Sequence, residues 1–400
     1  MSKKITSPFS KQDLMPQEET IEVTKKKGAL TIGIPKETHY QENRVCLTPD
    51  AVASLSTQGM KFIIETGAGE GANFSDKDYA TAGAKIAAGP KDVFACPIIL
   101  KVEPPSLGEI DLIQPQSVLF SALQLKRQNK VFFEALAQKR ITALAFDYIR
   151  DEHGIYSIVQ SLSEIAGTAA ILIAAEMLIK SPQGKGLLLG NISGVPPCEV
   201  VILGAGTVGE FAARSALGLG ANVKIFDKSI TKLRSIQRRL GRPVYTATIE
   251  PKILQKALMR CDVAIGAIRG KSRAPVCVNE EMVSNMKEGA VIVDVSIDRG
   301  GCFETAEITS HDNPTFTKHG VIHYCVPNIP SRYSRTASIS VSNIFSPYLL
   351  NILEEGGFEK AARHDKSLQK GMYFYHGILT NKTVADWFGL PFRDINLLFL

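Results

Sequence analysis

The stretch that decides the fold runs from Glu199 to Ala216 and reads EVVILGAGTVGEFAARSA. Apolar residues at 200–203 predict a buried strand, and the alanine-rich residues that follow predict a helix. Between them lies the spacing G-x-G-x-x-G, formed by Gly204, Gly206 and Gly209. The first glycine allows the tight turn, the second lets the backbone approach a pyrophosphate, and the third lets helix and strand pack closely. This strand–turn–helix context predicts a Rossmann-like nucleotide domain.

The next predicted strand, NVKIFD at 222–227, ends in an acid that bears on cofactor choice. Asp227 stands close to the roughly 20 residues downstream at which a ribose-binding carboxylate is expected. A carboxylate there accepts hydrogen bonds from the ribose hydroxyls and repels a 2′-phosphate. We therefore predict NAD rather than NADP, although the neighbouring Lys228 weakens the exclusion.

Short apolar runs alternate with helical segments on both sides of this stretch, which is typical of parallel sheets. Further strands are predicted at 30–35, 61–66, 97–102, 117–123, 141–149, 261–268, 290–297 and 321–326. Helices are predicted to begin at Thr48 and Ser75, to span 126–140 and 158–180, and to cover 334–355 with an interruption at Pro347. The predicted fold class is α/β, with two Rossmann-like doubly wound parallel-sheet domains joined by long helices.

We expect residues 1–28 to form a mobile N-terminal arm. Residues 29–157 together with 335–400 are expected to form the substrate domain, and 158–334 the NAD-binding domain.

Size and composition agree with this plan. A chain of 400 residues exceeds what one core usually supports, so two domains are expected. The net charge of +6 is mild and favours an anionic ligand over nucleic acid. The apolar runs are shorter than the ~20 residues of a membrane span, and the N-terminus lacks the apolar core of a signal peptide, so a cytoplasmic protein is expected. The 7 cysteines are scattered, which predicts reduced thiols, and we predict no metal site.

A second informative stretch, AVIVDVSIDRGGCFE, runs from Ala290 to Glu304 and contains two aspartates. Asp294 lies inside the β-branched run and is predicted to be structural. Asp298 stands where the run meets a pair of glycines. Because the carboxyl ends of strands face the ligand crevice in open α/β sheets, we predict that Asp298 faces the cofactor.

Together with the segments GIPKETHYQENRVCLTP (33–49), IILKVEPP (98–105), SLSEIAG (161–167) and YCVPNIP (324–330), these motifs carry a family resemblance. From Leu30 to its end the sequence resembles alanine dehydrogenases. It is more distantly similar to the nucleotide-binding subunit of proton-translocating nicotinamide nucleotide transhydrogenase.

The resemblance implies roles for individual residues. Arg44 would grip the substrate carboxylate with its guanidinium fork, and Lys101 would bind the substrate as an ammonium group. Asp298 would lie beside the nicotinamide and the reacting carbon, and transhydrogenases have an uncharged residue at its position. The other residues that the resemblance places around the cofactor are Ser163, Thr207, Val208, Lys232, Thr248, Ala267, Ile268, Val295, Ser296, Ile297, Val326, Asn328 and Ile329.

One position departs from the family. Its acid–base histidine would fall in LFSALQLK, where this sequence has Gln124. A glutamine can donate a hydrogen bond to a carbonyl oxygen, but it cannot carry a proton. Gln124 is nevertheless included with Asp298 and Lys101 among the candidate catalytic residues.

The resemblance implies NAD-dependent oxidative deamination of L-alanine to pyruvate and ammonia, and the reverse amination. It also implies a homo-oligomer, with a hexamer built through the long helices as the expected form. Three alternatives stay open: a dehydrogenase of another amino or imino acid, a catalytically weak NAD-binding regulatory protein, and a transhydrogenase subunit.

Overall fold

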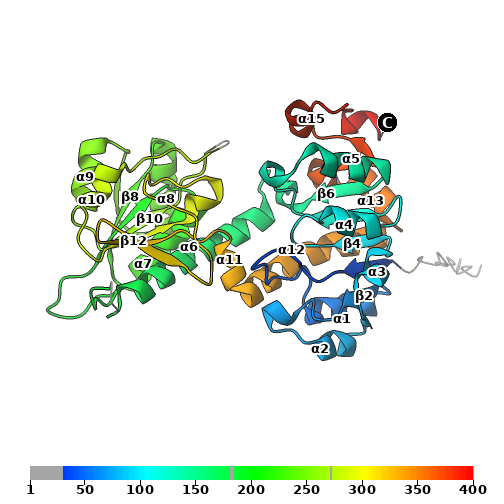
Figure 1. Ribbon diagram of the computed structural model, residues 1–400, viewed down its shortest axis with the longest axis horizontal. Helices are drawn as coiled ribbons and strands as arrows, with labels where there is room; N and C mark the ends of the chain where they lie inside the picture. Colours follow the sequence, from blue (N-terminus) through cyan, green and yellow to red (C-terminus); the bar gives the residue numbers. More distant parts are fainter. Residues whose placement is uncertain (1–29, 181–183, 271–272, 400) are drawn as a thin grey trace, which may run out of the picture.

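The computed structural model describes residues 30–180, 184–270 and 273–399, which form two α/β domains (Figure 1). Each domain is built on one mostly parallel sheet with helices on its faces, in agreement with the predicted fold class. The predicted N-terminal arm at 1–28 lies outside the described residues.

The first domain contains an eight-stranded sheet. Its parallel strands lie in the order β3-β2-β1-β4-β5-β6, so the order reverses between β1 and β4. Two antiparallel strands, β14 and β15, extend the sheet beyond β6. The bounds are β1 Thr31–Ile34, β2 Lys61–Glu65, β3 Lys85–Ala87, β4 Ile98–Leu100, β5 Val118–Ser121, β6 Thr142–Ala145, β14 Met372–Tyr375 and β15 Ile378–Leu379.

The second domain repeats this plan in a seven-stranded sheet. Its parallel strands lie in the order β9-β8-β7-β10-β11-β13, with β12 antiparallel on β13, and the order reverses between β7 and β10. In open α/β sheets such a reversal point opens the crevice that binds the ligand. The bounds are β7 Glu199–Leu203, β8 Asn222–Phe226, β9 Tyr245–Ala247, β10 Val263–Gly266, β11 Val291–Asp294, β12 Thr315–Lys318 and β13 Val321–Tyr324.

Both faces of each sheet are buried. In β4, Ile98 and Leu100 enter one core of the first domain, while Ile99 enters the core on the other face. In β7, Val200 and Val201 divide between two cores in the same way. Strands covered on both faces need apolar residues at every position, which explains the continuous apolar runs of the sequence.

The predicted helix starts are confirmed, because Thr48 caps α1 (Pro49–Thr57) and Ser75 caps α2 (Asp76–Thr81) through their side-chain oxygens. The helix predicted at 126–140 is shorter than expected. Asn129 caps α5 (Lys130–Gln138), and the preceding residues form the 3-10 turn η2 (Leu125–Arg127). The other short elements are η1 Glu70–Ala72, α3 Pro90–Phe94, α4 Leu107–Leu112, η3 Phe146–Tyr148, α7 Thr207–Gly218, α8 Ile230–Leu240, α9 Pro251–Leu258, α10 Glu280–Ser284, η4 Val295–Arg299, α11 Ile329–Arg332, α13 Phe358–His364, α14 Lys366–Gly371, α15 Lys382–Phe388 and η5 Ile395–Leu397.

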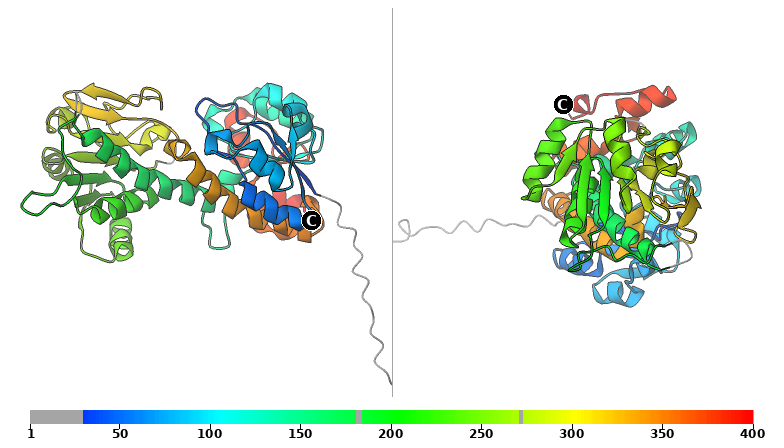
Figure 2. Two further views of the ribbon diagram at one scale, coloured as in Figure 1. Left: turned by 90° about the horizontal axis from the view of Figure 1, so that it is seen from below. Right: turned by 90° about the vertical axis from the view of Figure 1, so that its left-hand side faces the viewer.

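Two long helices, α6 (Ser157–Leu178) and α12 (Ser334–Glu354), connect the domains and pack against each other (Figure 2). By length and composition α6 could cross a membrane, but 44% of its apolar window is buried inside the protein. It packs against α7, α11, α12 and β11. A core helix meets the same length and composition criteria, so this is weak support for a membrane span.

The predicted interruption at Pro347 is wrong, because α12 continues through this residue. A proline in a helix removes one backbone hydrogen bond. Here the helix is held on both sides of the proline by apolar packing, since Phe345 and Leu349 are fully buried in the core of the first domain. Tertiary packing therefore outweighs the local preference.

Candidate active site

The glycine loop lies at the reversal point of the second sheet. A Cβ on Gly204 would lie 2.3 Å from the carbonyl oxygen of Ala267, and one on Gly209 would lie 1.9 Å from that of Gly204. A Cβ on Gly206, in contrast, would meet nothing within 4 Å. The first and third glycines are therefore required by packing, and the second leaves open space for a ligand. The helix α7 begins at Thr207 with free N–H groups at this opening, which suits a pyrophosphate.

Asp227 lies directly beside this loop. Its Oδ2 accepts a hydrogen bond from Ala205 N at 2.9 Å, and its Oδ1 accepts one from Ser229 N at 2.8 Å. The carboxylate is thereby fixed at the end of β8, where a ribose-binding acid is expected. Lys232 in α8 and Thr248 after β9 are exposed, and among the described residues neither side chain makes a hydrogen bond to the glycine loop.

The remaining cofactor candidates gather at the same edge of the sheet. Ala267 and Ile268 follow β10, the candidates from Val295 to Asp298 form η4 after β11, and Val326, Asn328 and Ile329 follow β13. Ile268 N donates to Ser296 Oγ at 2.9 Å, which joins two of these strand ends. Ser163 comes from α6, which packs against η4, and its hydroxyl donates to Val159 O.

The two aspartates of 290–304 differ in burial and in their hydrogen bonds. Asp294 is fully buried and accepts backbone hydrogen bonds from Ser296 and Cys302 at 2.9 and 2.8 Å, so it holds the turn that carries Asp298. Asp298 is exposed and accepts from Asn328 N at 3.0 Å. The protein around its cleft raises the pKa of Asp298 by desolvation. Because water still reaches this carboxylate, we expect the rise to be limited.

Lys101 occupies the reversal point of the first sheet, directly after β4. It is fully buried, and its Nζ donates to Glu37 Oε2 at 2.6 Å and lies 3.6 Å from Glu109 Oε1. Glu37 comes from the loop after β1 and also accepts from Val102 N. Burial alone would lower the pKa of Lys101, but the two carboxylates outweigh burial and raise it. The ammonium group therefore stays charged inside the protein.

Arg44 lies in the same loop after β1 and is also buried. Its Nε donates to Glu42 Oε1 at 2.7 Å, its Nη2 donates to the other Glu42 oxygen, and Nη2 lies 3.5 Å from Glu103 Oε1. Although burial acts to raise the pKa of Glu42, Arg44 lowers it to about 2. Glu42 thus occupies one edge of the guanidinium group, and the contacts of the described residues leave Nη1 for a further acceptor.

Asn328 joins the two reversal points. Its backbone N–H binds Asp298, while its Nδ2 donates to Glu42 Oε2 at 2.9 Å. Asn328 makes both contacts from a left-handed backbone conformation, with φ of 55°. Asp298 in the second domain and the Glu42–Arg44 pair in the first domain are therefore joined through one residue.

Gln124 follows β5 and also has a left-handed backbone, with φ of 44°. Its side-chain Nε2 donates to Glu103 Oε2, and its Oε1 accepts from Arg127 Nη1 at 3.1 Å. The sequence interpretation did not include the glutamates of this site, Glu37, Glu42 and Glu103. Glu42 lies two residues before Arg44, and Glu103 lies two residues after Lys101. This short spacing from a predicted substrate-binding cation is the signal in the sequence that could have pointed to both glutamates.

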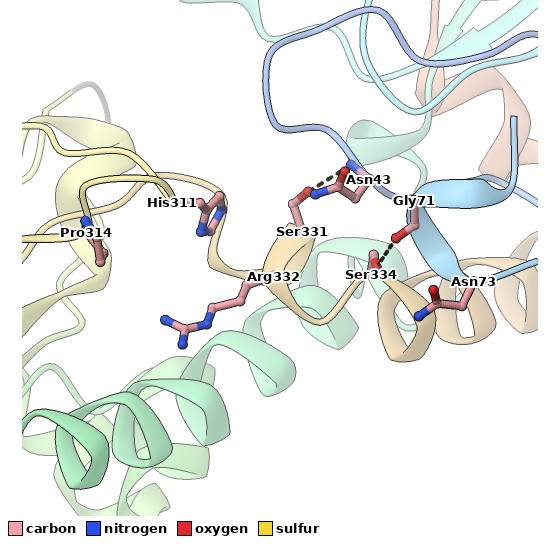
Figure 3. Close-up of a pocket in the computed structure, with 8 residues that line it drawn as sticks. All are labelled: Asn43, Gly71, Asn73, His311, Pro314, Ser331, Arg332 and Ser334. Carbon is pink, nitrogen blue, oxygen red and sulfur yellow. Dashed lines mark hydrogen bonds between the residues drawn. The ribbon is translucent and has the colours of Figure 1, made fainter. Parts of the chain in front are cut away.

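A polar pocket of about 520 Å³ lies beside this site, between the domains (Figure 3). It is lined by Asn43, Gly71, Asn73, His311, Pro314, Ser331, Arg332 and Ser334. The hydrogen bonds from Asn43 N to Ser331 Oγ and from Ser334 Oγ to Gly71 O cross it (Figure 3). Arg44, Lys101 and Asp298 are absent from this lining.

Comparison with known proteins identifies the family of this chain. The family models described as "Alanine dehydrogenase/PNT, N-terminal domain" and "C-terminal domain" match residues 33–166 and 170–382. The chain belongs to the alanine dehydrogenase/PNT family. The alanine dehydrogenase of Staphylococcus epidermidis is 38% identical over 92% of this chain and 99% of its own length. That of Methanococcus maripaludis is 39% identical over 91% of this chain and 98% of its own.

Solved structures of the family show the same architecture. An L-alanine dehydrogenase superposes with a TM-score of 0.83 at 36% identity, covering 89% of this chain and 98% of that one. A transhydrogenase from Sinorhizobium meliloti has a TM-score of 0.75 at 24% identity, covering 88% of this chain and 99% of its own, and shows the fold alone. Family membership, the open Gly206 and the fixed Asp227 agree on one cofactor: the enzyme is an NAD-dependent oxidoreductase.

Proposed function

We propose that this enzyme is an alanine dehydrogenase, which deaminates L-alanine to pyruvate and ammonia with NAD and catalyses the reverse amination. The observation that carries the proposal is the Asn328 bridge, because it links Asp298 to the Glu42–Arg44 pair. A small 2-oxo acid bound by Arg44 would therefore face the nicotinamide edge. The names and the extent of the curated relatives support the same substrate.

The chain's own residues would bind and orient this substrate. Bound NAD supplies the hydride chemistry at the α-carbon. The Nη1 edge of Arg44 would bind the substrate carboxylate, because a guanidinium group matches a carboxylate in shape and charge. Lys101 has three N–H donors; Glu37 accepts one at 2.6 Å and Glu109 lies 3.6 Å away, so a donor is left for the substrate oxygen. The exposed Asp298 carboxylate would stabilise the positive charge of the imine.

The domain roles follow from this placement. We propose that residues 29–157 with 335–400 bind the substrate and that 158–334 bind NAD. The positions of Arg44 and Lys101 on the eight-stranded sheet, and of the glycine loop on the seven-stranded sheet, support this division.

We also propose a cytoplasmic homo-oligomer, with a hexamer as the expected form. Its support is apolar exposure on the connecting helices, where Leu172 and Ile179 near α6 are 48% and 55% exposed and Ile339 on α12 is 43% exposed. Light scattering coupled to size-exclusion chromatography measures the number directly. A monomer in this experiment would contradict the proposal.

An alternative substrate is favoured by one observation. Arg127 donates to Gln124 and so places another cation at the rim of the substrate site. A 2-oxo acid with a second carboxylate could use this cation, which would make the protein a dehydrogenase of another amino acid.

The test follows NADH absorbance with purified protein, ammonium and one of three 2-oxo acids. Pyruvate is expected to give the highest kcat/KM, with glyoxylate and 2-oxoglutarate as competitors. A preference for 2-oxoglutarate would support the alternative. NADH binding without turnover of any 2-oxo acid would identify a regulatory protein, and hydride exchange with an NADP-binding partner would identify a transhydrogenase subunit.

A further inference from the structure

The proposed reaction needs a proton carrier that the amide of Gln124 cannot be. When ammonia has added to the carbonyl carbon, the hydroxyl group must leave as water, and this step needs an acid. Arg44 is permanently charged and Lys101 is held charged by its carboxylates, so neither readily exchanges a proton near neutral pH. The carrier must therefore be sought among the carboxyl groups around them.

Glu103 is placed for this task. It follows Lys101 by two residues on the loop after β4, and the residue is only 4% exposed. Its Oε1 lies 3.5 Å from Arg44 Nη2, and its Oε2 accepts from Gln124 Nε2. A substrate carboxylate on the free edge of Arg44 would lie next to this carboxyl group. The reacting carbon would then be within reach of Glu103, directly or across one water.

Glu103 differs from Glu37 and Glu42 in how closely a cation binds its carboxyl group. Glu42 is held by both nitrogens of the Arg44 fork, and Glu37 is held by Lys101 at 2.6 Å. Glu103 lies farther from Arg44, accepts from the neutral amide of Gln124 and shares a side-chain hydrogen bond with Glu42. Burial first, and then the nearby charge of Glu42, raise the pKa of Glu103 to about 7.

The segments after β1, β4 and β5 place charged groups around Glu103. The loop after β1 supplies Glu37, Glu42 and Arg44, and the segments after β4 and β5 supply Lys101, Glu109 and Arg127. Two other groups titrate nearby. His39 in the loop after β1 has a pKa lowered by burial and by Lys101, and burial raises the pKa of Asp147 to about 6. Asp147 accepts from Leu123 N rather than facing Arg44.

We infer that Glu103 exchanges the proton with the substrate oxygen in this site, in the place where the family resemblance expects a histidine. This inference rests on the proposed alanine dehydrogenase function. The role of Gln124 is then to position the Glu103 carboxyl group by donating to it, while Arg127 fixes the other end of the Gln124 amide.

The step is balanced as follows. In amination, protonated Glu103 gives its proton to the hydroxyl group of the carbinolamine, the carbon–oxygen bond breaks, and water leaves. The nitrogen lone pair forms the carbon–nitrogen double bond, and Glu103 becomes a carboxylate. In deamination, water adds to the iminium carbon while the Glu103 carboxylate accepts a proton from that water.

The pH dependence has a defined sign. Below a pKa near 7 Glu103 is protonated and competent for the acid step of amination, and above it the carboxylate is competent for deamination. Amination activity should therefore fall, and deamination activity should rise, as pH increases through this value.

The experiment compares Glu103→Gln, which keeps the shape but cannot titrate, with Glu103→Asp, His39→Gln and Asp147→Asn. We expect kcat of Glu103→Gln to fall by at least ~10²-fold, with a smaller change in KM for pyruvate. The near-neutral limb of the pH profile should vanish in Glu103→Gln and persist in the other three variants. Adding Gln124→His to Glu103→Gln should restore part of the rate, with a limb near the ~6.5 of a histidine.

A readout that does not depend on turnover separates this inference from the proposed function. Infrared difference spectra of wild type between acidic and alkaline pH should show a carboxylic acid band that titrates near neutral pH and is missing in Glu103→Gln. If wild type is inert with alanine but shows this band, the proposed function fails while the titration of Glu103 stands. If wild type is active and Glu103→Gln keeps both its rate and its near-neutral limb, the inference is overturned. NADH binding by fluorescence checks that each variant is folded.

Discussion

At the scale of single residues, the first prediction concerns the two edges of the Arg44 guanidinium group. Arg44→Lys keeps the charge but loses the planar arrangement that serves Glu42 on one edge and the substrate on the other. We expect kcat/KM for pyruvate to fall about 10- to 100-fold, which corresponds to the ~1.5–3 kcal/mol of a hydrogen bond between charged groups. The dissociation constant of NADH, measured by fluorescence, should not change. Unchanged pyruvate kinetics would show that Arg44 is not the carboxylate ligand.

Cofactor choice gives the second prediction at this scale. Asp227→Ala removes the carboxylate fixed by Ala205 N and Ser229 N, and with it both the ribose acceptor and the repulsion of a 2′-phosphate. The ratio of NADPH to NADH dissociation constants, which we expect to be large in wild type, should approach one. Lys228→Ala is the matched control and should shift the ratio in the opposite direction. Equal affinities in wild type would contradict the ribose assignment.

The sequence could place these residues at strand ends but could not show their partners. Gly204, Asp227 and Asp298 follow predicted strands, and parallel strands bring their carboxyl ends to one edge. The pairing of Lys101 with Glu37, in contrast, joins residues 64 positions apart. Such pairs depend on the order of strands in the sheet, which periodicity in one sequence does not encode.

At the scale of elements, the turn η4 depends on a single buried acid. Both oxygens of Asp294 accept hydrogen bonds from backbone N–H groups. In Asp294→Asn the side-chain NH₂ group would face one of these N–H donors, so a buried hydrogen bond would be lost. We expect the free energy of unfolding to fall by about 2–3 kcal/mol, measured by urea denaturation, together with weaker NADH binding. Asp386→Asn changes an exposed acid and should stay within ~0.5 kcal/mol of wild type. If Asp294→Asn and Asp386→Asn have the same free energy of unfolding, Asp294 does not stabilise the turn η4.

The elements show which patterns predict structure well. All the strands predicted from apolar runs occur, but those predicted at 141–149 and 290–297 are shorter, because the chain turns into η3 after Ala145 and into η4 after Asp294. The sequence does not predict β3, β9, β12, β14 and β15; β14 lies inside the sheet between β6 and β15, and the other four lie at sheet edges. At an edge the partner strand rather than the local sequence decides the conformation. The helix α12 continues through Pro347 because of its tertiary packing, and a single sequence does not show that packing.

At the scale of the whole molecule, the loop of Arg44 is attached to the opposite domain. Tyr40 Oη and Gln41 Nε2 both donate to Asp312 Oδ2 across the domain junction. Asp312→Ala removes both contacts from an exposed position, so the free energy of unfolding should change by less than ~0.5 kcal/mol. KM for pyruvate should nevertheless rise about 2- to 10-fold, because ordering such side chains costs ~0.5–1.5 kcal/mol each. An unchanged KM would show that these contacts do not order the substrate loop.

The extension of the first sheet by β14 also has a consequence for biosynthesis. Strand β6, at 142–145, pairs with β5 on one side and receives its second neighbour from residues 372–375. The N-terminus of a chain leaves the ribosome first, and domains generally fold as units during synthesis. The seven-stranded sheet can close while β6, buried on all four residues in the finished protein, still has an open edge. Nascent chains stalled before residue 372 should therefore need chaperones to avoid pairing through that edge, and chains released after β14 should not.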